Sequence, residues 1–458
     1  MDRFKLSQYL HICADEELLP GKSILFATRS GSALEISNPQ LQALQQGDWD
    51  KISINTLAKL VEVEVLVPEE EDELAGMLEY NIANVKDIDN QKLSFTIQPS
   101  ANCQLGCHYC GQQHVKKVLD DNTAELILDR IRSQVGAHKD HIRELYINWY
   151  GGEPLTGLSS LKKLSSRVIA LAREHKLNYS AFIVTNGLSL KPAIFEELVS
   201  QHYIMGYQIT VDGTAEYHDK RRYLKSKEQS FDIIFNNICD IVNGPFYKNS
   251  GANIVIRCNV DAENKENVLQ LLDLLEEKNI LPFVSFYVAP IHDWGDNLAT
   301  QSIHGITKED FAQFEIEVYM RLLQAGVLQN SKKGLLPKRK SLTCMVVSET
   351  SEVIDAYGNV STCWEIPYTP AYEGTDFIAG NLHQDPSVST ANAPMREWFK
   401  EIPENDSWCK TCKFLPVCGG ACPKAWYHGS PACPSFKYNI NERLFLNKMT
   451  IQLNQEIK

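Results

Sequence analysis

The strongest constraint on the fold is a regular alternation of apolar, β-rich runs with helical patterns between residues 93 and 289. We predict six strands, at residues 93–97, 145–150, 181–184, 208–211, 254–259 and 285–288. Helical windows lie between most of them, at residues 124–135, 194–199, 231–242 and 268–277. Because strands that are joined through helices run parallel, this order predicts an α/β fold with a partial, TIM-like (βα)6 barrel. Such folds bind ligands at the carboxyl ends of their strands.

Three cysteines follow the first predicted strand, and they are Cys103, Cys107 and Cys110. Structural zinc sites take four ligands, and no fourth cysteine or histidine stands at a matching pair spacing, although His108 and His114 are close. A zinc site and buried thiols are the alternatives. Three thiolates on a four-iron cluster would leave one iron open to a substrate or cofactor, as catalytic metal sites require.

The three cysteines, with the aromatic Tyr109 just before the third, resemble the signature of the radical S-adenosylmethionine (SAM) enzymes. The resemblance continues through the middle region. Residues 151–154 read GlyGlyGluPro after the second predicted strand, residues 185–187 read ThrAsnGly after the third, and residues 210–213 read ThrValAspGly after the fourth. The resemblance implies that the triad ligates a [4Fe–4S] cluster whose open iron chelates SAM. One electron would then release a 5′-deoxyadenosyl radical that abstracts hydrogen from an unreactive C–H bond.

The same resemblance implies a set of residues that bind SAM: Tyr109, Gly151, Gly152, Glu153, Asn186, Thr210, Asp212 and Arg257. Tyr109 would lie near the adenine. The glycines would let backbone carbonyls approach the methionine amino group, and Glu153 would pair with its ammonium. Thr210 and Asp212 would hold the ribose and the methionine carboxylate. Arg257 is a further carboxylate candidate, although an arginine in a strand is as often a structural ion-pair partner.

Seven further cysteines lie toward the C-terminus in a spaced order: Cys344, Cys363, Cys409, Cys412, Cys418, Cys422 and Cys433. This order resembles the SPASM domain of peptide-modifying radical enzymes, which carries two auxiliary four-iron clusters. By that pattern, auxiliary cluster II takes Cys409, Cys412, Cys418 and Cys433. Auxiliary cluster I takes Cys344, Cys363 and Cys422. Together with the triad, the resemblance implies three [4Fe–4S] clusters, and a zinc ribbon is the alternative for Cys409 and Cys412 alone.

The sequence departs from the fully ligated SPASM pattern just before Cys344. Relatives that close auxiliary cluster I often have a further cysteine there, whereas residues 338–343 read LysArgLysSerLeuThr. We therefore expect an open iron in this cluster, which would bind a substrate heteroatom or a non-cysteine ligand. Glu365 follows CysTrp at the place where related maturases keep an acidic base, and a plain surface carboxylate is the alternative.

The first 85 residues suggest a small winged-helix-like α+β module. Extended segments are expected at residues 23–28 and 32–36, helices at 40–46 and 54–61, an apolar run at 65–67, and an acidic run at 69–73 that starts a solvated helix. The module resembles the leader-binding region found before many maturases of ribosomally synthesised, post-translationally modified peptides (RiPPs). Such regions bind a leader peptide as an added strand.

Composition excludes several other classes of protein. A net charge of −13 argues against sequence-independent nucleic-acid binding, and the chain has no 18-residue apolar run and no signal segment. We expect a cytoplasmic protein that binds neither nucleic acid nor membrane. Thirteen cysteines in a reducing compartment are not expected to form disulfides, and the three outside the clusters, Cys13, Cys239 and Cys258, are expected to be buried.

The sequence thus predicts three domains, at residues 1–85, 90–325 and 335–445. The function expected from the resemblance is a radical SAM/SPASM maturase that abstracts hydrogen from a precursor peptide bearing a leader. It would form an intrapeptide thioether, C–C or C–O crosslink, with electrons from a flavodoxin or ferredoxin. One alternative is an enzyme like the anaerobic sulfatase maturases, which form formylglycine on a protein. The other is a non-catalytic iron–sulfur carrier or sensor.

Overall fold

The computed structural model describes residues 4–291, 305–328, 334–340, 342–405, 407–429 and 432–456. The chain divides into two compact units. The first unit contains Met1–Lys86, Lys333–Val347 and Glu397–Lys458, and the second contains Asp87–Lys332 and Ser348–Arg396. Residues 335–445 are shared between the two units, so the separate C-terminal domain remains a prediction.

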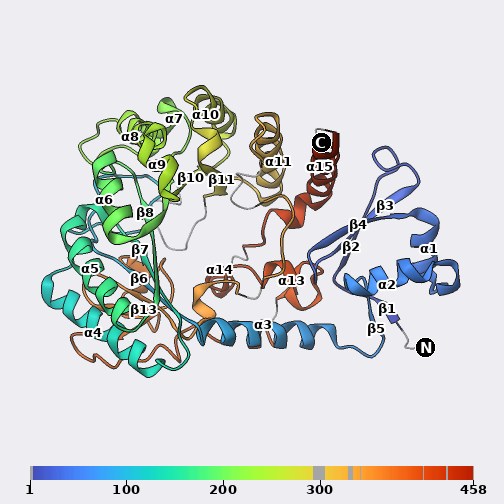
Figure 1. Cartoon of the computed structure of the whole chain (residues 1–458), viewed down its shortest axis with the longest axis horizontal. Coiled ribbons are helices and arrows are strands. Elements are labelled where there is room, and N and C mark those ends of the chain that lie inside the picture. Colours follow the sequence, from blue (N-terminus) through green and yellow to red (C-terminus); the bar gives the residue numbers. More distant parts are fainter. Residues whose placement is uncertain are drawn as a thin grey trace. The chain divides into compact units, whose positions relative to one another are not determined.

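The second unit is built on a nine-stranded sheet with the order β11-β10-β9-β8-β7-β6-β12-β13-β14 (Figure 1). Six strands pair in parallel in their chain order: β6 (Lys92–Ile97), β7 (Glu144–Trp149), β8 (Asn178–Thr185), β9 (Ile204–Thr210), β10 (Asn253–Val260) and β11 (Ser285–Pro290). Each of the six predicted strands overlaps one of these. The predicted partial (βα)6 architecture is therefore confirmed.

Helices connect the parallel strands and lie outside them (Figure 1). They are α4 (Asp121–Ala137), α5 (Leu158–Glu174), α6 (Pro192–His202), α7 (Ala215–Arg221), α8 (Phe231–Asn243), α9 (Pro245–Ser250), α10 (Lys265–Glu277) and α11 (Lys308–Gln324). The four predicted helical windows correspond to α4, α6, α8 and α10. Helix α5 was missed, although Leu161, Leu164, Val168 and Leu171 are buried at helical spacing.

Three short strands extend this sheet beyond β6. Strand β12 (Ser351–Ile354) pairs in parallel with β6, and β13 (Asn359–Ser361) and β14 (Ile378–Asn381) follow in antiparallel order. The buried Arg130 of α4 makes a two-pronged ion pair with Glu352 of β12, at 2.5 and 3.1 Å. Bidentate pairing of this kind fixes orientation as well as distance, so it anchors β12 to the barrel.

The first unit contains an antiparallel sheet in the order β2-β3-β4. Its strands and helices are β1 (Phe4–Leu6), β2 (Leu10–Ala14), β3 (Lys22–Ala27), β4 (Ser32–Ser37), α1 (Asn38–Gln46), α2 (Ile54–Glu62), β5 (Leu66–Pro68), α12 (Trp398–Glu401), α13 (Leu415–Cys418), α14 (Pro423–Tyr427) and α15 (Phe436–Glu456). Helix α3 (Glu73–Asp89) begins in this unit. The predicted segments at residues 23–67 are confirmed, whereas β1 and β2 were missed.

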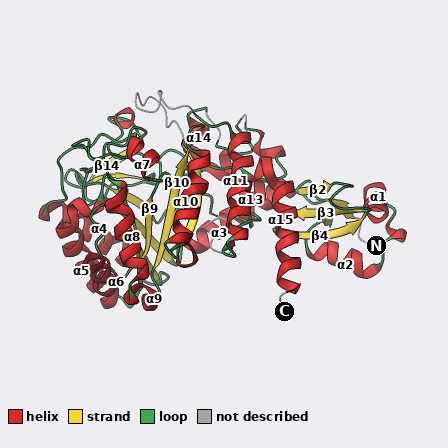
Figure 2. Ribbon diagram, turned by 90° about the horizontal axis from the view of Figure 1, so that it is seen from above, coloured by secondary structure: helices red, strands yellow, loops and turns green. Residues whose placement is uncertain are grey.

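The β2-β3-β4 sheet is covered on both faces. Leu25 belongs to one core with residues of α1 and α2, including Leu44 and Leu60. Phe26, which is next in the strand and points to the other face, packs in a second core with Phe414 and Leu444. Figure 2 shows α15 beside this sheet. The N-terminal module thus shares a hydrophobic core with the cysteine-rich segment.

The acidic run at residues 69–73 leads into a helix as the sequence suggested, but only Glu69, Glu70 and Asp72 of this run are exposed. Helix α3 does begin at Glu73, but this side chain is only 5% exposed. It accepts hydrogen bonds from the Ser7 hydroxyl and the Gln8 amide. Arg29 supplies the compensating charge, with nitrogens 2.8 Å from Glu71 and 3.4 Å from Glu73. A buried carboxylate needs such partners, so Glu71 and Glu73 serve internal packing.

Candidate radical SAM active site

The three triad cysteines lie on the loop that leaves the carboxyl end of β6. Two backbone bonds fix this loop to residues that follow α7, because the amides of Gly106 and His108 donate to the carbonyls of Tyr223 and Arg221, at 2.8 and 3.1 Å. The Cys110 amide donates to the Cys107 carbonyl at 3.1 Å. The loop is thus held at the strand ends, where the fold predicts a ligand site.

The environment of the triad thiols disfavours free thiolates. Burial above all, together with Glu153 and the other two thiols, raises the pKa of Cys103 to about 12. Burial also raises the pKa of Cys107 to about 11, while the nearby Arg222 lowers it. Three thiols that repel one another when ionised are a donor set for a cationic centre, because metal ligation keeps cysteine deprotonated. The triad therefore fits an iron–sulfur cluster with three protein ligands.

Gly151 and Gly152 form a close turn against the cysteine loop. Their φ angles are +91° and +48°, in the region that favours glycine. A Cβ on Gly151 would lie 2.4 Å from Gln98 Cδ, and one on Gly152 would lie 2.6 Å from Asn102 O. Only glycine allows this approach, so the turn provides backbone groups beside the cysteine loop without side chains in the way.

Gln98, at the end of β6, is the most unusual polar group beside this turn. It is fully buried, yet among the described residues neither its amide oxygen nor its amide nitrogen has a hydrogen-bond partner. An unsatisfied buried amide costs roughly 1–3 kcal/mol. A bound polar group at this turn would remove that cost, so the site fits an amino-acid-like ligand such as the methionine part of SAM. No sequence pattern singles out Gln98.

Glu153 braces the ends of two strands. Its carboxylate accepts hydrogen bonds from the Thr185 hydroxyl at 2.6 Å, the Asn186 amide at 2.6 Å and the Leu155 amide at 3.0 Å. Burial raises its pKa, whereas these bonds oppose the rise. Three of its acceptor positions are used within the chain. Its predicted pairing with an ammonium would use the remaining capacity, and that role remains a prediction.

Asn186 lies directly beside the first cysteine. Its side-chain nitrogen donates to Cys103 Sγ at 3.7 Å and to Gln104 Oε1 at 3.3 Å. Its side-chain oxygen accepts from the Leu188 amide at 2.9 Å, which fixes the orientation of the side-chain amide. The structure therefore brings this predicted site residue together with the triad.

The Tyr109 hydroxyl is the centre of a buried hydrogen-bond network. It donates to Asp212 at 2.5 Å and accepts from Arg222 at 2.7 Å and from Asn259 at 3.0 Å. Burial raises its pKa well above the usual value, so the phenol stays protonated. Tyr109 thus ties the cysteine loop to the ends of β9 and β10, in addition to any contact with an adenine.

Asp212 carries the anionic charge of this network. Its side chain is fully buried and also accepts from the Asn259 amide at 2.9 Å. Arg221 lies 3.8 Å away and makes a closer pair with Asp261, at 2.6 Å. The carboxylates of Asp212 and Asp261 and the guanidiniums of Arg221 and Arg222 therefore neutralise one another at the strand ends. This position supports an architectural role for Asp212, whereas ligand binding by it remains a prediction.

Arg222, Asn259 and Asp261 were missed by the sequence analysis. A signal was available, because Asn259 lies at the end of the fifth predicted strand and Asp261 just follows it, where polar side chains collect in this fold. Arg222 follows the segment GluTyrHisAsp at 216–219 without a regular pattern. Its partner Tyr109 is 113 residues away in the sequence, so only the folded chain shows their contact.

Arg257 lies in the barrel interior among polar groups from several strands. Burial alone would lower its pKa, but Tyr287, Glu365, Tyr150 and Tyr109 around it raise the pKa. Its Nε donates to Asn259 Oδ1 at 2.8 Å. Thr210 is its register partner on β9 and is 9% exposed. Both predicted residues therefore lie at the strand ends that carry the network.

Glu365 is half-buried rather than a plain surface carboxylate. It is among the groups that raise the pKa of Cys110, after burial as the main cause, and it has the same effect on Tyr150. The ring of Tyr150 packs on Trp364, with centroids 5.2 Å apart. The structure thus brings the candidate base together with the third triad cysteine and an aromatic residue that directly precedes the glycine turn.

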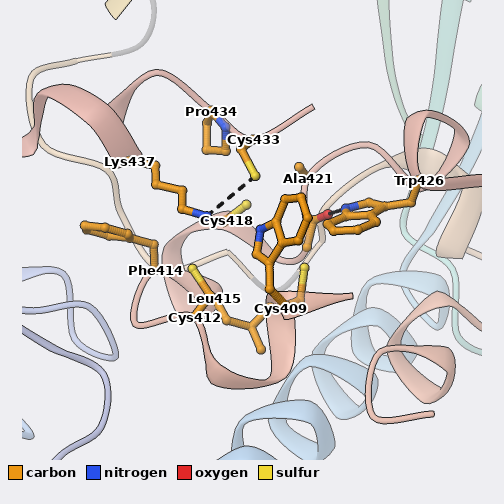
Figure 3. Close-up of a pocket in the computed structure, with 12 residues that line it drawn as sticks. Cys409, Cys412, Phe414, Leu415, Cys418, Ala421, Trp426, Cys433, Pro434 and Lys437 are labelled. Carbon is orange, nitrogen blue, oxygen red and sulfur yellow. Dashed lines mark hydrogen bonds between the residues drawn. The ribbon is translucent and has the colours of Figure 1, made fainter. Parts of the chain in front are cut away.

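Four C-terminal cysteines line one pocket in the first unit (Figure 3). They are Cys409, Cys412, Cys418 and Cys433, the set predicted for auxiliary cluster II. The pocket lies between Trp408, Phe414 and Trp426, and its empty space, including the part open to solvent, is about 310 Å³. Burial above all, together with neighbouring thiols of the set, raises the pKa of Cys409 to about 11 and that of Cys418 to about 12. The pocket therefore fits a cluster with four thiolate ligands.

The set predicted for auxiliary cluster I is divided between the units. Cys344 and Cys422 belong to the first unit and Cys363 to the second. Within the first unit, the Thr343 hydroxyl donates to Ala421 O at 3.1 Å, which links the residues just before Cys344 and Cys422. The grouping of the three cysteines, and an open iron there, remain predictions.

The cysteines outside these sets differ in burial. Cys13 and Cys258 are buried as predicted, whereas Cys239 on α8 is half-buried, so that prediction was wrong for Cys239. In the described ranges, no group of three His, Cys, Asp or Glu residues is placed as a single metal ion would require. No helix within the same ranges is long and apolar enough to cross a membrane.

Comparisons with known proteins agree with this site. Residues 97–290 match the model of the Radical SAM superfamily. The serine-type anaerobic sulfatase-maturating enzyme of Bacteroides thetaiotaomicron is 24% identical over 365 residues, which cover 71% of this chain and 80% of that protein. The solved structure of anSMEcpe with bound AdoMet and Cp18Cys peptide is 18% identical, with a TM-score of 0.57, over 80% of this chain and 100% of that chain.

A second solved structure covers more of the chain. SuiB of Streptococcus suis bound to precursor peptide SuiA is 15% identical, with a TM-score of 0.50, over 94% of this chain and 99% of that chain. At these identities the solved structures show a shared fold. The family match, the three-cysteine loop and the parallel barrel agree with one another. Residues 97–290 of this chain therefore form a radical SAM domain, and the cysteine-rich region that follows has a cysteine order that resembles the SPASM domain.

Proposed function

We propose that the chain is a peptide maturase that abstracts a hydrogen atom from a residue of a ribosomally synthesised precursor and forms an oxidative crosslink within that peptide. The crosslink is a thioether, or a C–C or C–O bond to an aromatic side chain. The main support for a peptide substrate is an edge strand that lies next to a groove in the first unit. Strand β4 pairs with β3, and the groove beside it, of about 640 Å³, lies between β4 and α15.

This edge suits a leader peptide. Backbone groups on an unpaired strand edge bind an extended peptide, and neighbouring pockets take its alternate side chains. Ala33 and Leu34 of β4 line the groove together with Leu444 and Ile451 of α15, so apolar leader residues would be buried there. The precursor-bound SuiB structure covers 94% of this chain, whereas anSMEcpe covers 80%. The larger coverage by the precursor-bound structure supports the proposal that this chain has an additional part that binds a peptide.

The proposed cofactors follow from the thiol sets. Cys103, Cys107 and Cys110 would hold the cluster that binds SAM, and the two C-terminal sets would hold auxiliary clusters. When bound, the reduced cluster and SAM supply the radical that removes hydrogen. Gly151, Gly152 and Gln98 would then orient the methionine part of SAM.

Other residues of the chain would act on the peptide. Glu365, beside Tyr150 and Arg257, is the proposed base that takes a proton from the group forming the new bond. The reaction removes two protons and two electrons from the peptide, one proton as part of the abstracted hydrogen atom and the other through Glu365. One electron leaves with the abstracted hydrogen atom, and the auxiliary clusters accept the other. A flavodoxin or ferredoxin supplies the electron that starts each cycle.

Formylglycine formation is the second candidate, and the similarity to a sulfatase-maturating enzyme favours it. Mass spectrometry separates the two after the chain is coexpressed with each short peptide that is encoded beside its gene. A crosslink is expected to reduce the peptide mass by two hydrogens without reaction with a hydrazide probe. Oxidation of serine removes the same mass but creates an aldehyde that the probe labels. Labelled product from a sulfatase peptide, with an unchanged precursor, would reject the crosslinking proposal.

Replacing Gln98 is expected to increase the stability of the chain and to weaken its binding of SAM. In the cluster-loaded chain without SAM, Gln98→Leu is expected to raise the free energy of unfolding by about 1–2 kcal/mol, because it removes an unsatisfied buried amide. The same change is expected to weaken SAM binding about tenfold, which corresponds to the loss of one hydrogen bond of about 1.4 kcal/mol. Denaturant titration and isothermal titration calorimetry measure the two effects.

The matched control is Gln91→Leu, which makes the same change at an exposed position just before β6. It is expected to leave both SAM affinity and stability unchanged. If Gln98→Leu bound SAM as tightly as the unmodified chain, Gln98 would not contact the cofactor.

A further inference from the structure

The pocket of auxiliary cluster II contains a cation that the cysteine pattern does not predict. Lys437 lies in the first turn of α15, and its Nζ donates to Cys433 Sγ at 3.8 Å (Figure 3). The same Nζ lies over the ring of Trp408, 5.3 Å from its centroid. The side chain is half-buried, so the indole and the thiol together hold the ammonium at the pocket wall.

The surrounding segment has an unusual charge for this chain. The chain as a whole carries a net charge of −13, whereas residues 407–440 contain no Asp or Glu and four lysines, Lys410, Lys413, Lys424 and Lys437. Lys437 acts on Cys409, because its charge opposes the burial that raises the pKa of that thiol. Lys340 acts on Cys418 in the same way. The pocket is therefore apolar in its lining and positive in its surroundings.

We propose that Lys437 tunes auxiliary cluster II by donating a charge-assisted hydrogen bond to the thiolate of Cys433. This inference rests on the proposed assignment of that cluster. Adding one electron to a [4Fe–4S] cluster raises its negative charge by one, and a fixed cation stabilises the reduced form more than the oxidised form. The protein lining excludes water on one side, which strengthens the effect. Lys437 therefore raises the reduction potential and makes the cluster a better acceptor of the electron that the substrate radical must lose.

The test is a redox titration of the full-length, reconstituted protein, followed by electron paramagnetic resonance with dithionite as the reductant. The titration is done in a background with Cys103, Cys107 and Cys110 replaced by alanine, so that only auxiliary clusters contribute. Lys437→Met is expected to lower the equilibrium constant for reduction of one cluster about tenfold, which is about 59 mV for one electron. Lys437→Arg, which keeps the charge and a donor, is expected to restore most of that loss.

Lys410→Met is the matched control, because Lys410 lies on the same segment and is exposed. It changes the net charge equally and is expected to leave the potential nearly unchanged, since water screens its charge. Iron content and thermal unfolding are expected to be the same in all three variants. Equal potentials for Lys437→Met and the unmodified chain, with the cluster present, would overturn the role of Lys437 alone. A chain that loads no cluster on the four cysteines would overturn the cluster assignment as well.

Discussion

Replacing Cys107 with alanine is expected to abolish the formation of 5′-deoxyadenosine from SAM and to remove about four iron atoms per chain. Cys107 is one of three thiols on a loop that the backbone of residues 221–223 holds at the strand ends. A cluster with three protein ligands has no spare ligand, so the loss of one thiolate removes the iron that SAM needs. Anaerobic reconstitution, iron analysis and chromatography of the nucleoside product measure both effects.

The matched control is Cys239→Ala on α8, a half-buried thiol outside all three predicted sets. It is expected to retain full iron content and full SAM cleavage. Full cleavage by Cys107→Ala would show that the cysteine loop does not hold the radical-generating cluster, and the assignment of the active site would then fail.

Asp212→Ala is expected to lower the free energy of unfolding by about 3–5 kcal/mol, because it leaves buried cations without their partner. The fully buried carboxylate accepts from Tyr109 and from the Asn259 amide, and Arg221 lies 3.8 Å from it. Since Tyr109 lies between two triad cysteines, the loop is expected to loosen and iron occupancy to fall in parallel. Denaturant titration and iron analysis of the variant test this.

Asp385→Ala removes an exposed carboxylate from the same unit and is the matched control, with stability expected to be unchanged. The free energy of unfolding of Asp212→Asn is expected to lie between those of Asp212→Ala and the control. The asparagine keeps an acceptor for Tyr109 but loses the charge. If Asp212→Ala were as stable as the unmodified chain, the network would not be the support of the cysteine loop that its hydrogen bonds indicate.

The parts of this fold that the sequence predicts are those with a strong local signal. The barrel strands are short, mostly buried runs that contain β-branched and aromatic residues, so their composition identifies them. The cysteine loop and the glycine turn follow such runs directly, and that position placed them at the strand ends. Helix α5 was predictable in the same way from its buried leucines, whose spacing the analysis did not use.

The missed features depend on contacts between distant residues. The bond from Asn259 to Tyr109 spans 150 residues, and the bond from Arg222 spans 113. Gln98 has no sequence pattern at all, and its importance comes from burial without a partner among the described residues. The burial of Glu73 follows from Arg29, which lies 44 residues away. Local propensity does not carry information of this kind.

Hydrogen transfer from the peptide to the cofactor tests the central claim most directly. The coexpressed precursor is prepared with perdeuterated residues and incubated with the reconstituted enzyme, SAM and dithionite. We predict that deuterium appears in 5′-deoxyadenosine and that the peptide product has lost two hydrogen isotopes in a crosslink. SAM cleavage that yields only unlabelled 5′-deoxyadenosine, with the precursor unchanged in mass, would contradict the assignment of this chain as a peptide maturase.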